Sequence, residues 1–87
     1  MNLPSGRILT RREIEAMLDK MVRVALDGMS TDWSCRKVLE EVVPAQDIES
    51  ALDAFKPIAQ QIITRSNHKI IELVAGGVTA IVKRYGG

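Results

Sequence analysis

The stretch IIELVAGGVTAIVKRY, residues 70–85, decides the fold class of this chain. Read as a β-hairpin, its two flanks pair across a two-residue Gly-Gly turn, and Val, Ile and Thr favour strands. However, neither flank alternates apolar and polar residues, and a hairpin added to helices would expose two long edges. An α+β fold with a hairpin over residues 69–84 is therefore the alternative rather than the first prediction.

Read as a helix, the same stretch separates into two stripes. One is apolar at three-and-four spacing and comprises Ile70, Leu73, Val74, Gly77, Val78, Ile81 and Tyr85. The other comprises Glu72, Gly76, Thr79 and Lys83. This separation outweighs the roughly 1 kcal/mol that each mid-helix glycine costs relative to alanine. The sequence therefore predicts a last helix over residues 68–84.

The first half of the chain also carries helical signals. Thr10 and Glu13 match a capping box at the start of a helix that Gly28 can end. A second helix follows three candidate caps at residues 30–32 and stops before Pro44. Its predicted core face comprises Trp33, Val38, Leu39 and Val42.

A third helix is predicted from Pro44 to Phe55, since proline is tolerated in a first helical turn. Its acidic residues are expected to face outward, namely Asp47, Glu49 and Asp53. Pro57 is expected to break or kink the chain before the helical pattern resumes. Together these segments predict an all-α domain over residues 10–87, a bundle of four to five short helices.

Composition limits the class of protein. Eighty-seven residues make one domain, and aromatic residues are only 3% of a chain that is 46% hydrophobic, so the core must be aliphatic. The net charge of +1 exerts no overall pull toward nucleic acid or membrane. The longest charge-free run, residues 73–82, is short of the roughly 20 apolar residues of a membrane span.

Residues 1–9 include Pro4 and Gly6 and are expected to form a flexible arm. This end of the chain lacks the apolar region of a signal peptide, and a single cysteine excludes an internal disulfide framework. Both observations predict a cytoplasmic protein.

The residues that carry chemistry are few and dispersed. The chain has one His, one Cys and one Tyr, and it contains no phosphate-binding loop and no metal-ligand spacing. We expect His68 to be a solvated neighbour of a helix start and Cys35 to fill the core, although nearby basic residues can lower a thiol pKa. The sequence predicts neither an enzyme nor a cofactor.

Charge is unevenly distributed along the chain. Residues 1–30 carry five basic against four acidic side chains, residues 31–56 three against six, and residues 57–87 four against one. The acidic middle can lie beside the basic end within one folded domain. Alternatively, two oppositely charged faces meet between protomers or meet a partner.

A strip of small residues marks a second candidate surface, formed by Ala75, Gly76, Thr79 and Ala80. Small side chains let two helix backbones approach closely. The contact can lie inside the monomer, against the first helix, or at a two-fold axis where the helix meets its own copy.

Two functions fit these features. The favoured prediction is a protein–protein interaction module, such as an adaptor, inhibitor or regulatory subunit, that acts as a homodimer on an unidentified partner protein. The alternative is a nucleic-acid-binding regulator that uses a basic patch of Arg7, Arg11, Arg12, Lys83 and Arg84. A pI near 7.9 argues against the alternative. A helix-turn-helix over residues 34–55 would also present acidic side chains to phosphates.

Overall fold

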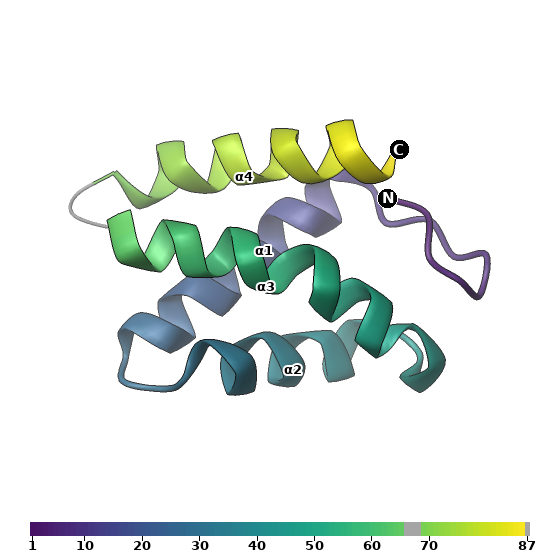
Figure 1. Ribbon diagram of the computed structural model, residues 1–87, viewed down its shortest axis with the longest axis horizontal. Helices are drawn as coiled ribbons and strands as arrows, with labels where there is room; N and C mark the ends of the chain where they lie inside the picture. The colour runs from purple at the N-terminus through teal and green to yellow at the C-terminus, as the bar shows by residue number, and fades with distance from the viewer. Residues whose placement is uncertain (66–68, 87) are drawn as a thin grey trace.

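The computed structural model describes residues 1–65 and 69–86, which form four α-helices (Figure 1). A short 3₁₀ turn, η1, precedes the third helix. The elements in chain order are α1 (Arg11–Leu26), α2 (Thr31–Val42), η1 (Ala45–Asp47), α3 (Ile48–Arg65) and α4 (Ile70–Tyr85). The predicted all-α fold is confirmed.

The hairpin alternative over residues 69–84 is wrong, because Ile70–Tyr85 is one continuous helix that includes both glycines. Its buried positions, Val74, Gly77, Val78 and Ile81, belong to the apolar stripe of the helical interpretation. Among the described residues the only β-type pairing is an isolated bridge between Asn2 and Ile8. The last helix was predicted from residue 68, which lies outside the described residues.

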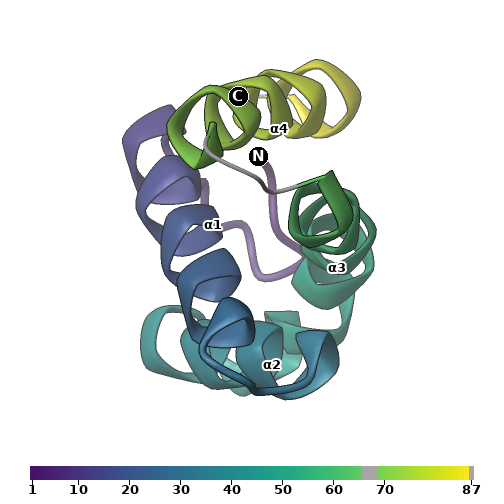
Figure 2. The ribbon, with the colours of Figure 1, turned by 90° about the vertical axis from the view of Figure 1, so that its left-hand side faces the viewer.

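The four helices surround one core (Figure 2). α4 packs against α1 and α3, and α2 closes the opposite side of the bundle. The core is aliphatic except for Phe55 and a few sulfur-containing side chains, as the composition predicts. In the described part of the chain, no helix is both long and apolar enough to cross a bilayer.

α1 begins with the predicted capping box. Glu13 N donates to Thr10 Oγ1 at 3.1 Å, and Thr10 N donates to Glu13 Oε1 at 2.9 Å. These two bonds satisfy amides that a first helical turn leaves without partners. Gly28 follows the end of the helix with φ of +108°, a backbone conformation that glycine adopts without strain.

α2 also starts at a predicted cap, since Trp33 N donates to Ser30 Oγ at 3.1 Å. The prediction that Trp33 lies on the core face is wrong, because this residue is 44% exposed. Ser34 and Cys35 occupy the inward positions instead, in line with Val38 and Leu39. The buried Ser34 hydroxyl is satisfied by Ser30 O at 2.7 Å, which lets a polar residue take this place.

α3 continues through Pro57, so of the predicted break or kink the break is wrong, and the kink stays a prediction. Proline removes one helical hydrogen bond, and the carbonyl that loses its donor is that of Asp53. Both residues are exposed, so water can reach this carbonyl. Buried side chains on both sides of the proline, at Phe55, Ala59 and Ile62, hold both halves of α3 against the core.

The N-terminal segment, residues 1–9, folds back onto the bundle rather than extending from it. Met1, Leu3 and Leu9 are buried in the core, although a flexible arm was expected. Leu9 N donates to Met1 O at 2.8 Å, and Ser5 N donates to Asp47 Oδ1 at 2.9 Å. The mobility of this segment stays a prediction, but its position is fixed by buried side chains and by a hydrogen bond to η1.

Candidate interaction surface

α4 packs closely against its neighbours at Gly77. A Cβ built there would lie 2.7 Å from Ile58 Cγ2, 2.8 Å from Leu18 Cδ2 and 3.1 Å from Ile62 Cδ1. Real Cβ atoms do not approach carbon atoms this closely, so only glycine fits without displacement of the core. A close contact of α4 with α1 and α3 therefore exists at Gly77, which is not one of the four residues of the predicted strip.

Gly76 is not part of that contact. A Cβ there would meet no atom within 4 Å, and Ala75, Thr79 and Ala80 are exposed as well. The prediction that this strip packs inside the monomer is therefore wrong. Consecutive helical residues point about 100° apart, so the residue that enters the core leaves its neighbour on the outside. The alternative, a contact between chains, stays a prediction.

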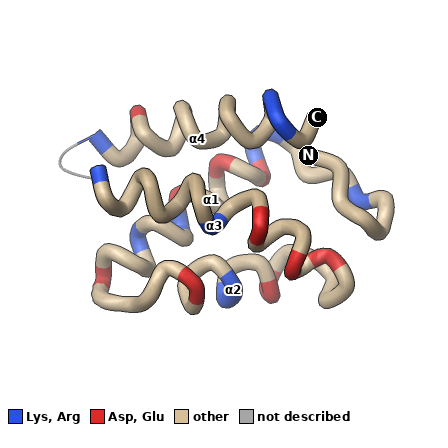
Figure 3. The backbone as a smooth tube through the Cα atoms, in the orientation of Figure 1, with Lys and Arg blue, Asp and Glu red and all other residues tan. Residues whose placement is uncertain are grey.

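The exposed side of α4 is a small-residue surface with a charge at each end. We define the α4 outer face as Glu72, Ala75, Gly76, Thr79, Ala80 and Lys83, all of which are exposed. Figure 3 shows α4 uncharged between an acidic position near its start and basic positions at its end. A flat strip about three helical turns long is thus open to solvent.

A shallow groove between α3 and α4 runs along the edge of this face. Its central part has a volume of about 240 Å³ and is lined by apolar residues that include Ile58, Leu73 and Ala80. Arg65 and Glu72 line the same part. A neighbouring hollow of about 270 Å³ continues toward the end of α4 and is lined by residues that include Asp53, Pro57, Arg84 and Tyr85.

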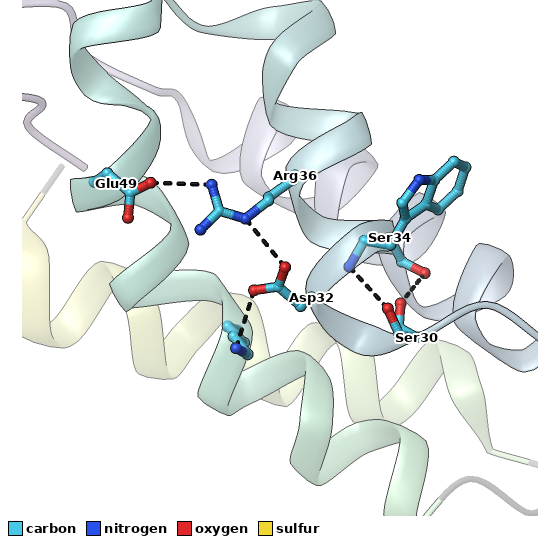
Figure 4. A network of polar contacts seen from close by, with 7 residues as sticks. Ser30, Asp32, Ser34, Arg36 and Glu49 are labelled. Carbon is cyan, nitrogen blue, oxygen red and sulfur yellow. Dashed lines mark hydrogen bonds and ion pairs between the residues drawn. The ribbon is translucent and has the colours of Figure 1, made fainter.

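The ion pairs found among residues 1–65 and 69–86 do not involve α4. In these ranges six pairs join side chains of α1, α2, α3 and the N-terminal segment. Figure 4 shows one network, in which Arg36 lies between Asp32 and Glu49 at 3.0 Å from each. Within the described ranges, Glu72, Lys83 and Arg84 take part in no ion pair. The charges of α4 are therefore available to another molecule.

The predicted basic patch is divided among different environments. Arg7 pairs with Glu13 at 3.2 Å and donates to Val42 O, so this charge is partly neutralised. Thr10 N–H donation, with a smaller contribution from Arg7, holds the pKa of the Glu13 carboxyl below its usual range. Arg12 lines a depression together with Glu15 and other residues of α1 and α4.

Only part of the patch comes together. Arg11 donates to Thr79 Oγ1 at 3.0 Å. Thr79 lies one helical turn before Lys83 in α4, so this bond places Arg11 at the border of the α4 outer face. Arg84 lies with its guanidinium carbon 5.6 Å from the centre of the Tyr85 ring. It also lines the hollow beside Asp53. The five basic residues thus do not form one continuous surface free of acidic neighbours.

Two further groups that could carry chemistry, Cys35 and Asp47, are held inside the fold. Cys35 is fully buried, and burial raises the pKa of its thiol to about 11, so it is a poor nucleophile at neutral pH. The prediction that Asp47 faces outward is wrong, because this side chain is buried and accepts hydrogen bonds from Ser5 N and Ser5 Oγ. His68 lies outside the described residues. Among those described, no group of three or more His, Cys, Asp or Glu side chains is arranged to hold a metal ion.

Two features of this surface were not found from the sequence. One is the groove between α3 and α4, since a groove depends on how two helices pack. The other is the different environment of the two adjacent glycines. The sequence did contain a signal for the difference between the two glycines. The helical pattern of residues 70–85 assigned Gly77 to the apolar stripe and Gly76 to the polar stripe.

Comparison of the chain with protein-family models, with curated proteins and with solved structures finds no match.

Proposed function

We propose that this protein is a non-enzymatic protein–protein interaction module that occupies a partner's surface through the α4 outer face. The observation that carries the proposal is the exposure of Gly76. Glycine costs about 1 kcal/mol relative to alanine within a helix, and no atom lies within 4 Å of the position of its missing Cβ. No contact within the described chain requires a glycine here, whereas the close approach of a partner's backbone would.

The surroundings of Gly76 support the same proposal. Ala75, Thr79 and Ala80 keep the strip flat, and Ile58 and Leu73 add apolar surface in the groove beside it. Charged side chains lie at both ends of this area. Protein interfaces commonly combine an apolar centre with a polar rim of this kind.

A module of this kind acts by occupancy, as an adaptor, inhibitor or regulatory subunit does. Its effect requires only that the partner's surface is covered, so no reacting side chain is needed. The buried thiol of Cys35 is compatible with this role, since burial protects it from solvent. A cytoplasmic location stays a prediction.

The proposal can be tested by capture from the cells that make the protein. Tagged wild type would be compared with Ala80→Arg, which places a long side chain on the α4 outer face. The matched control is Glu40→Lys, which changes an exposed residue of α2 on the opposite side of the bundle. We expect a protein, either a different chain or the untagged protein itself, to be retained by wild type and by the control but lost with Ala80→Arg. Equal retention by all three would contradict the proposal.

The same variant separates this function from nucleic-acid binding. Ala80→Arg adds a positive charge one turn from Arg84, which would strengthen contacts to phosphates. The two functions therefore predict opposite effects of one substitution. Material that is retained more strongly by Ala80→Arg, and that a nuclease removes, would favour the nucleic-acid alternative.

A further inference from the structure

The charges of the α4 outer face have a symmetric order along the helix. Glu72 stands at one end, Lys83 at the other, and the four residues between them on this face are small. At 1.5 Å per residue the two charges are about 16 Å apart along the helix axis. Neither charge has an ion-pair partner in the described part of the chain.

This order is complementary to itself when the helix is reversed. In an antiparallel pair about a two-fold axis between residues 77 and 78, Glu72 lies opposite Lys83 of the second copy. Gly76 lies opposite Thr79 of the second copy, and Ala75 lies opposite its Ala80. Every position of the face then meets either an opposite charge or another small residue. We propose that the occupant of the α4 outer face is α4 of a second copy of this chain, packed antiparallel to the first.

The opposite orientation is disfavoured by the same residues. A parallel pair in register would place Glu72 against Glu72 and Lys83 against Lys83, and like charges in contact weaken association. The antiparallel pair also aligns the positive end of each helix dipole with the negative end of the other. It is a closed two-fold arrangement in which both copies use the same surface, the commonest form of a soluble dimer.

The apolar surroundings complete the interface. Ile71, which is 76% exposed, borders the face beside Glu72. In the antiparallel register it lies level with the last turn of the second α4, where the aliphatic stem of Lys83 can reach it. The small residues at the centre let the two helix axes approach to the lower end of the usual 8–10 Å range.

This inference rests on the proposed function, because it names the partner of the same face. The test uses purified full-length protein and sedimentation over a concentration series from micromolar to millimolar. The variants are E72K, K83E, their double variant and the control E40K on α2. Circular dichroism verifies that each variant is folded before its association is measured.

Each single reversal turns both symmetric charge contacts of the dimer from attraction to repulsion. We therefore expect E72K alone and K83E alone to dimerise about tenfold more weakly than wild type, or worse. The double variant and an equimolar mixture of E72K with K83E both restore opposite charges at both contacts, so both should dimerise about as well as wild type. E40K should have no effect, and added salt should weaken the wild-type dimer.

Two results would overturn the inference. One is a wild-type protein that stays monomeric over the whole concentration series. The other is a dimer whose affinity is the same in wild type and in both single reversals, since that dimer uses another surface. Either result leaves the proposed function standing if capture from cells still retains a different protein that Ala80→Arg releases. Loss of that sensitivity in the capture experiment is what would contradict the proposed function itself.

Discussion

At the scale of single residues, the two adjacent glycines of α4 differ in environment, because one faces the core and the other faces solvent. Gly77 lies against Ile58, Leu18 and Ile62 at distances that leave no room for a methyl group. Gly76 has open space where its side chain would be. The first glycine is required by the core of the monomer, and the second is not.

Alanine substitution at these two positions should therefore change stability in opposite directions. Gly76→Ala should raise the free energy of unfolding by about 0.8–1 kcal/mol through helix propensity alone. Gly77→Ala gains the same propensity, but the overpacking of a well-filled core costs about 1–3 kcal/mol, so the net effect should be a loss. The β-branched Ile58 cannot easily rotate its Cγ2 away within a helix, and Leu18 is fully buried. Urea unfolding of both variants measures the difference, and equal effects at the two positions would contradict this account of α4.

Cys35 gives a prediction with a defined pH dependence. Burial raises its thiol pKa from 9.0 to about 11, so the fold favours the protonated form. The resulting stabilisation is complete below pH 9 and is lost as pH rises toward 11, because the unfolded chain releases its proton first. We expect the urea midpoint of wild type to fall over this range and that of Cys35→Ala to fall less. Alkylation at neutral pH should be slow until urea unfolds the protein, and rapid alkylation of the folded protein would show that the thiol is accessible.

At the scale of elements, amphipathic periodicity and capping residues were sufficient to predict most helices. Thr10 with Glu13 and Ser30 mark helix starts through bonds that span only three residues, so a sequence displays them directly. The break at Pro57 and the core position of Trp33 were predicted wrongly for a different reason. Whether a helix survives a proline, or leaves a tryptophan outside, depends on packing against elements that are distant in the sequence.

Asp47 is the clearest case of a long-range determinant. Its carboxylate accepts hydrogen bonds from Ser5, which is 42 positions earlier in the chain. No local pattern could indicate that a single acidic residue among several would be buried. The bond links η1 to the N-terminal segment, and it explains why residues expected to be a flexible arm lie on the bundle.

Removal of this carboxylate should detach the N-terminal segment. Asp47→Ala leaves the amide and hydroxyl of Ser5 without their partner, and hydrogen bonds to charged groups contribute about 1.5–3 kcal/mol. We expect a loss of stability of that order, together with faster hydrogen exchange at Leu3 and Leu9. Asp53→Ala is the matched control, because Asp53 is an exposed acid of α3 with no ion pair to a described residue. Unchanged exchange in Asp47→Ala would mean that the buried side chains alone hold the segment.

At the scale of the whole molecule, charge and close packing are distributed unequally between the two sides of the bundle. Ion pairs connect α1, α2, α3 and the N-terminal segment, whereas α4 is held by apolar contacts through Gly77 and its neighbours. Among the described residues, the α4 outer face thus takes part in no ion pair, and the residues of this face between Glu72 and Lys83 are small. The composition of the helix predicted that small residues would matter, but only the packed structure shows which of them are covered by the monomer.

Stability and self-association should therefore oppose each other at Gly76, and the Gly76→Leu variant separates them. In dilute solution this variant should melt above wild type, since leucine improves helix propensity by roughly 0.8 kcal/mol, or about 3–6 °C for a domain of this size. At high concentration the wild-type dimer gains stability by mass action. Each tenfold rise in concentration above its Kd adds roughly 0.7 kcal/mol per chain, or about 3–5 °C. The leucine side chain blocks the antiparallel contact, so the Tm of the variant should stay constant over the same series.

The curves of Tm against protein concentration for wild type and Gly76→Leu should then cross as concentration rises. Curves that remain parallel would show that Gly76 is exposed in every state of the protein, whereas a variant that melts below wild type even in dilute solution would show that the monomer itself needs a glycine there.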